Sequence, residues 1–89
     1  MSADLPLKIQ LTGTPFRYLQ SLDRPTKERI RAKLEGIAAD PTNVHLSYPL
    51  VGVDKRCTRV GKYRVLFQIT ETALVVSDIG PRGQIYRKA

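Results

Sequence analysis

The residues of this chain that could do chemistry are cations and tyrosines, and most of them lie in its C-terminal part. Residues 54–89 carry eight basic and three acidic side chains, whereas residues 1–53 carry seven basic and five acidic ones. The basic residues of this part are Lys55, Arg56, Arg59, Lys62, Arg64, Arg82, Arg87 and Lys88, with Tyr63 and Tyr86 among them. Guanidinium groups bind phosphate through paired hydrogen bonds, and aromatic rings stack on nucleobases. The pattern indicates a polyanionic partner, most often nucleic acid, with an acidic protein or an anionic membrane surface as alternatives.

Composition excludes several other classes of function. The chain has 89 residues, a formal charge of +7, one His and one Cys. A single Cys cannot form an internal disulfide, and so few soft ligands argue against a zinc site, so we expect no metal and no cofactor. The sequence contains no Gly-rich phosphate loop and no nucleophile-elbow motif. Without a long apolar segment or a leader peptide, we expect a cytoplasmic protein with no membrane partner.

The elements that must position these cations begin with a strand and a short helix. Apolar residues alternate with others over residues 5–11, which predicts a strand with one buried face, and Pro6 favours an edge position. Thr14 followed by Pro15 is typical of a helix start. We therefore expect a first helix over about 15–22.

A second helix follows, beginning at Asp23-Arg24-Pro25 and ending at Asp40-Pro41. Its apolar residues Ile30, Leu34, Ile37 and Ala38 have the i, i+4, i+7, i+8 spacing of a single stripe. The two helices should form a hairpin with one face for a sheet. Residues 41–52, with two prolines and a glycine, are expected to form an irregular connection.

The remaining sequence predicts consecutive antiparallel strands. Three β-branched and aromatic runs, 55–60, 63–70 and 73–79, are separated by the short turns Gly61-Lys62 and Glu71-Thr72. Residues 80–83 are expected to form a turn, and residues 84–88 a short closing strand or tail. The chain is thus predicted to be a single α+β domain over 1–89, with a two-helix hairpin on one face of a mostly antiparallel sheet in the order β-αα-β-β-β.

Strand alternation predicts which side chains share a face. In the run 63–70, Tyr63, Val65, Phe67 and Ile69 point one way, and Arg64, Leu66 and Gln68 point the other way. If the apolar set packs on the helices, Arg64 stands on the open face. In the preceding strand, Lys55, Cys57 and Arg59 share one face and Arg56 and Thr58 the other, and the register that decides which set joins Arg64 stays open.

Two motifs in the C-terminal part resemble the RelE/ParE superfamily of toxins from toxin–antitoxin systems. They are Arg59-Val60-Gly61-Lys62-Tyr63-Arg64-Val65-Leu66-Phe67 and Ile79-Gly80-Pro81-Arg82-Gly83-Gln84-Ile85-Tyr86. The resemblance implies a RelE-like, ribosome-dependent endoribonuclease that cuts mRNA by attack of a ribose 2′-hydroxyl on the adjacent phosphate. It also implies a cognate antitoxin as a partner, besides mRNA and the ribosome.

The resemblance assigns roles to individual residues. Arg64 matches the arginine that stabilises the phosphate, and Arg82 an arginine for charge stabilisation or proton donation. Tyr86 matches a late tyrosine that stacks on a base or orients the nucleophile, and Lys55 falls where some members carry a basic lysine. Contacts with RNA or the ribosome are expected from Arg56, Arg59, Lys62, Arg87 and Lys88.

The chain departs from the family pattern at two positions, which keep other functions open. Pro81 stands where many members have His or Lys, and Cys57 stands where some have a second lysine. Cys57 is expected to be a packing residue, and His45 a loop residue. The alternatives are a ParE-like inhibitor of DNA gyrase and a non-toxic, basic nucleic-acid-binding module.

Overall fold

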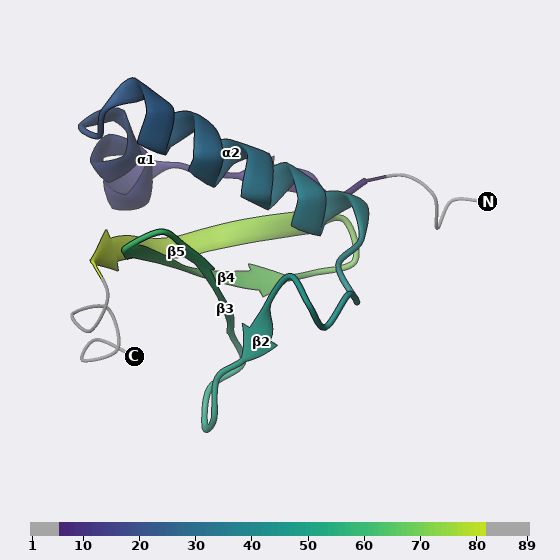
Figure 1. Ribbon diagram of the computed structural model, residues 1–89. Coiled ribbons are helices and arrows are strands. Elements are labelled where there is room, and N and C mark those ends of the chain that lie inside the picture. The colour runs from purple at the N-terminus through teal and green to yellow at the C-terminus, as the bar shows by residue number, and fades with distance from the viewer. Residues whose placement is uncertain (1–5, 82–89) are drawn as a thin grey trace.

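Two helices cover one face of a five-stranded sheet in the part of the chain that the structure, a computed structural model, describes, residues 6–81 (Figure 1). The elements are β1 (Lys8–Gln10), α1 (Gly13–Gln20), α2 (Arg24–Ala39), β2 (Tyr48–Pro49), β3 (Arg56–Val60), β4 (Tyr63–Ile69) and β5 (Ala73–Pro81). The predicted α+β class and the helix hairpin on a mostly antiparallel sheet are confirmed. None of the helices within residues 6–81 is long and apolar enough to cross a membrane.

The strands lie in the order β1-β5-β4-β3-β2. β3, β4 and β5 pair antiparallel as consecutive hairpins, whereas β1 pairs parallel with β5. The edge position that Pro6 predicted for the first strand is confirmed, because β1 is an outer strand of the sheet. β4 is the central strand, and the buried sheet residues of the main core cluster all belong to β4 and β5.

The core lies between α2 and the helix-facing side of β4 and β5. Ile30, Leu34 and Ile37 of α2 are at most 1% exposed, as expected for the predicted stripe. They pack in one cluster with Val65 and Phe67 of β4. At the edge of this cluster, the rings of Tyr18 and Tyr63 meet edge to face with centroids 6.3 Å apart. Because one alternate set of β4 side chains is buried here, the other set must point to the opposite face.

The structure corrects predictions for three segments. Helix α1 begins at Gly13 with Thr12 as its N-cap, two residues before the predicted start, because Pro15 is tolerated anywhere in a first turn, where amides lack intrahelical acceptors. The connection 41–52 contains the two-residue strand β2, which pairs with β3. Gly80 and Pro81 continue β5 instead of forming a turn, since Pro81 at the strand end needs no ladder amide.

Asp23 caps α2, at the start that the sequence predicted for this helix, because its Oδ2 accepts a hydrogen bond from the Thr26 amide at 3.4 Å. This hydrogen bond lowers the pKa of the Asp23 carboxyl below its ordinary value of 3.8. We expect Asp23→Ala to lower the melting temperature at pH 7 by roughly 4–8 °C.

The effect of this cap should depend on pH. A carboxyl whose pKa is lower in the folded state stabilises the protein above its unfolded pKa, and this stabilisation is lost as the pH falls through the folded value. The difference in melting temperature between wild type and Asp23→Ala should therefore shrink between about pH 5 and pH 2. A difference that stays constant over this range would contradict the role of the ionised carboxylate.

Candidate nucleic-acid interface

The register between β3 and β4 places Arg59 and Arg64 directly opposite each other. Directly opposed residues of an antiparallel pair share a face, with Cβ atoms about 4.5–5.5 Å apart. The face is the one turned away from the helices, because Thr58 and Val65, the next pair, are buried on the helix side. The open face of the sheet, as we use the term below, carries Tyr48, Cys57, Arg59, Arg64, Leu66, Gln68 and Asp78.

Arg64 is nearly buried on this face, with 9% of its surface exposed. Its Nη1 donates a hydrogen bond to the hydroxyl of Tyr48 at 2.5 Å. Tyr48 lies on the open face because β2 pairs it with Cys57. A guanidinium that is held in a fixed position and partly removed from water interacts more strongly with an anion than a freely hydrated one.

An apolar cluster divides the open face into two ends. Cys57 is fully buried and Leu66 is 3% exposed, and they pack with Tyr48 and Leu50. Cys57 is therefore the packing residue that the sequence predicted. Its side chain packs against apolar neighbours, so a lysine at this position would have to bury its charged group away from water.

Lys55 lies at the far end of the open face from Arg64. It immediately precedes β3, four residues before Arg59, which corresponds to about 13 Å along an extended strand. At this end, Leu50 donates its amide to the Lys55 carbonyl at 2.9 Å, and Gln68 Nε2 donates to Asp54 Oδ2 at 3.2 Å. The structure thus brings Arg59 to Arg64 but leaves Lys55 at a separate position.

Arg56 and Lys62 do not share the position of Arg64. Arg56 is opposite the core residue Phe67, and it binds Ser47 twice, with Nε to Oγ at 2.8 Å and Nη2 to the carbonyl at 3.0 Å. These bonds tie the connection after α2 to β3. Lys62 is exposed in the two-residue turn, next to Gly61, whose φ of +59° favours glycine.

The remaining predicted site residues, Arg82, Tyr86, Arg87 and Lys88, lie outside the described residues, as does the strand expected over 84–88. The described part ends next to the cationic pair, because Gly80 is the partner of Arg64 across β4 and β5. Within residues 6–81 no group of three His, Cys, Asp or Glu side chains could hold a metal ion.

Tyr48 is the site residue that the sequence did not single out, and its hydroxyl is expected to support Arg64. Tyr48→Phe removes an acceptor from a nearly buried guanidinium, so it should lower the free energy of unfolding by about 1–3 kcal/mol. Urea unfolding measures this change. Tyr18→Phe, on the helix side, is the control, and an equal loss in both variants would contradict a specific role of Tyr48.

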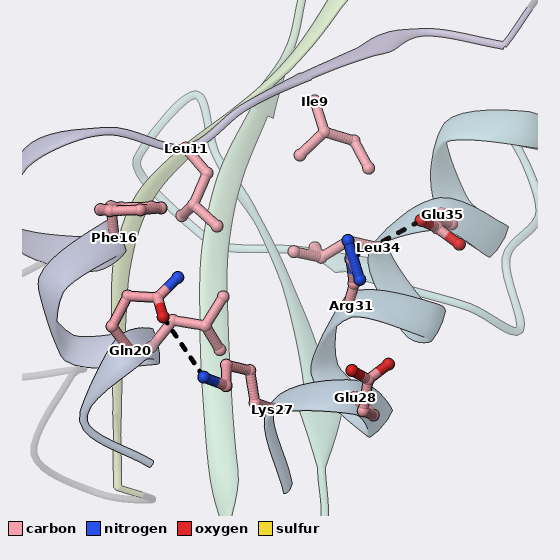
Figure 2. A pocket seen from close by; sticks show the side chains of 10 residues that line it. Ile9, Leu11, Phe16, Gln20, Lys27, Glu28, Arg31, Leu34 and Glu35 are labelled. Atoms are coloured by element: carbon pink, nitrogen blue, oxygen red, sulfur yellow. Dashed lines mark hydrogen bonds and ion pairs between the residues drawn. The ribbon is translucent and has the colours of Figure 1, made fainter. Parts of the chain in front are cut away.

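The molecule also has a groove on its helix side, separate from the open face. It has a volume of about 480 Å³ and lies between β1, α1 and α2, with Ile9, Leu11 and Leu34 among its lining residues. Figure 2 shows that charged side chains of α2 stand along it, including Lys27 and the ion pair of Arg31 with Glu35. Acidic and basic side chains both line this groove, whereas Arg59 and Arg64 on the open face are both positively charged.

No protein-family model matches this sequence, and no curated protein matches it. Several solved structures resemble its fold, and three of them show the extent of the likeness. A chain of the toxin–antitoxin complex RelBE2 from Mycobacterium tuberculosis aligns with a TM-score of 0.74 and 24% identity, over 90% of this chain and 95% of that one. A chain of the archaeal RelE–RelB complex from Pyrococcus horikoshii aligns with a TM-score of 0.73 and 18% identity, over 90% of this chain and 99% of that one. A mutant of the E. coli toxin RelE in the free state aligns with a TM-score of 0.78 and 16% identity, over 96% of this chain and 95% of that one.

These alignments cover nearly the whole of each chain, so the likeness concerns the complete domain and not a shared substructure. The resemblance that the two sequence motifs suggested is therefore confirmed for the fold: this chain has the fold of the RelE toxins.

Proposed function

We propose that this protein is the toxin of a type II toxin–antitoxin system, and that it cleaves mRNA on the ribosome. The observation that carries the proposal is the pair of Arg59 and Arg64 on the open face of a RelE fold, with Arg64 held by Tyr48. Two arginines at directly opposed positions can contact the oxygens of one phosphodiester or of two neighbouring ones. A chain of formal charge +7 would also be attracted to RNA over a longer distance.

The proposed reaction is the attack of a ribose 2′-oxygen on the adjacent phosphorus. A bond forms between the 2′-oxygen and phosphorus, the bond to the 5′-oxygen breaks, and the proton lost by the 2′-hydroxyl is balanced by one that the 5′-oxygen gains. Arg64 would stabilise the negative charge on the pentacoordinate phosphorus, since preorganised donors act where charge develops. In this proposal Arg82 stabilises charge or donates the proton, and Tyr86 stacks on a base or orients the nucleophile.

The proposed reaction also needs a group that accepts the proton of the 2′-hydroxyl. Lys55 is the candidate that the sequence suggests, but about 13 Å of strand separates its backbone from that of Arg59. An extended lysine side chain spans only part of this distance. We therefore propose that Arg64 contributes more to cleavage than Lys55, which would contact the RNA at the other end of the open face.

The proposed antitoxin would act by covering the open face. Two of the similar solved structures are complexes of a toxin with its antitoxin, which supports such a partner for this chain. An acidic segment laid over Arg59 and Arg64 would neutralise both guanidinium groups and exclude RNA. We expect the gene of an acidic partner next to the gene of this protein.

The decisive experiment adds the purified protein to a reconstituted translation reaction and maps the 5′ ends of the mRNA. The proposal expects new cuts within translated codons, and none when ribosomes are omitted. Intact mRNA in both reactions would contradict it. Supercoiling of plasmid DNA by gyrase is measured in parallel, because inhibition of gyrase with intact mRNA would instead identify a ParE-like activity.

A further inference from the structure

A second hollow, of about 160 Å³, opens beside Arg59 between α2, the connection after it and β3. Three of its lining residues can carry positive charge, and each comes from a different element: Lys33 from α2, His45 from the connection and Arg59 from β3. Ser47, Tyr48 and Thr58 bring hydroxyl groups to it. No carboxylate is among the described residues that line it, in contrast to the groove of Figure 2.

The inner wall of this hollow is fixed by hydrogen bonds. Thr58, 1% exposed, donates its hydroxyl to the Leu46 carbonyl at 2.7 Å. Ser47, 5% exposed, accepts from Arg56 Nε at 2.8 Å, so its own hydroxyl proton remains available for donation. The His45 amide donates to Asn43 Oδ1 at 2.8 Å. The connection is thus held against β3, and the groups that line the hollow need little reorganisation to bind a ligand.

The hollow is continuous with the open face through two residues. Tyr48 lines it and also accepts the hydrogen bond of Arg64, and Arg59 lines it and is also the cross-strand partner of Arg64. An extended anion bound at Arg64 therefore has a second cationic position immediately beside it. A single carboxylate or phosphate would occupy only one of the two positions, whereas a single-stranded nucleic acid offers successive phosphates.

We infer that this hollow is a second phosphate subsite, which holds the phosphodiester next to the one at Arg64 in a bound RNA strand. The inference rests on the proposed function. Lys33 and Arg59 supply charge, and the Ser47 hydroxyl supplies a neutral donor from a buried position. A phosphodiester can accept from all of them because its two free oxygens can each accept more than one hydrogen bond.

The test compares the binding of two RNAs that cannot be cleaved, a 2′-O-methyl pentanucleotide and a 2′-O-methyl dinucleotide with one phosphodiester. In the variant Lys33→Ala/His45→Ala we expect about tenfold weaker binding of the pentanucleotide and little change for the dinucleotide. The logarithm of the association constant for the pentanucleotide decreases with the logarithm of the salt concentration. In the double variant this dependence should become less steep by about 0.7, because the Lys33 contact is lost. Lys27→Ala, on the groove side of α2, removes the same charge and should bind both RNAs as wild type does.

Equal binding of the pentanucleotide by wild type and by the double variant, with equal salt slopes, would overturn the inference. Amide resonances of residues 44–47, which belong to the connection that lines the hollow, provide a second readout, since they should shift with the pentanucleotide and not with the dinucleotide. The translation reaction separates this inference from the proposed function. If the wild type cleaves mRNA but the double variant binds the pentanucleotide as the wild type does, only the inferred subsite is wrong. If the double variant binds the pentanucleotide more weakly but the wild type cleaves no mRNA, only the proposed nuclease activity is wrong.

Discussion

Replacing Arg64 by alanine is expected to lower the rate of mRNA cleavage in a translation reaction by about 10²–10³-fold. The guanidinium is nearly buried, fixed by Tyr48, and placed beside Arg59 on the open face. In the proposed reaction, its loss removes a preorganised donor from the position where charge develops on the phosphate. A ribosome-dependent cleavage assay with mapped 5′ ends measures the effect at equal concentrations of folded protein.

Two further variants make this prediction specific. Arg64→Lys keeps the charge but not the planar pair of donors, so it should recover only a small part of the activity. Arg24→Ala removes one exposed cation at the start of α2 and should cleave like wild type. Equal losses in Arg24→Ala and Arg64→Ala would mean that only net charge matters, and the proposed role of Arg64 would then be wrong.

The faces of the central strand β4 could be predicted because its two alternating sets of side chains differ in polarity. In β4, the alternation of Val65 and Phe67 with Arg64 and Leu66 assigns each side chain to a side once the apolar set is placed against the helices. The register that pairs Arg59 with Arg64 could also have been predicted from the sequence. A two-residue turn at Gly61-Lys62 pairs Val60 with Tyr63, and hence Arg59 with Arg64, so the turn length held the signal.

Other features depend on packing between distant segments and left no signal in the sequence pattern. β2 has only two residues, too few for any periodicity, and its pairing with β3 is what brings Tyr48 to Arg64. In β5 the register shifts opposite Leu66 and Phe67. The buried residues Leu74, Val76 and Ile79 therefore do not keep a period of two, and simple alternation would have misplaced Asp78.

The largest expected effect on stability comes from replacing a residue on the helix-facing side of β4. Phe67 is fully buried in the cluster of α2, β4 and β5, so Phe67→Ala should lower the free energy of unfolding by about 3–5 kcal/mol. A chain of this size is stabilised in total by about 4–13 kcal/mol. The variant would thus lose a large share of its stability, and urea unfolding followed by circular dichroism measures the loss.

Phe16→Ala is the matched control, because Phe16 is 44% exposed and its truncation should lower the free energy of unfolding by much less. Equal losses in the two variants would contradict the assignment of the core. The two β4 variants should also differ in activity. Phe67→Ala acts on folding, so its cleavage rate should follow its folded fraction, whereas Arg64→Ala acts on the open face and should stay inactive even where it is fully folded.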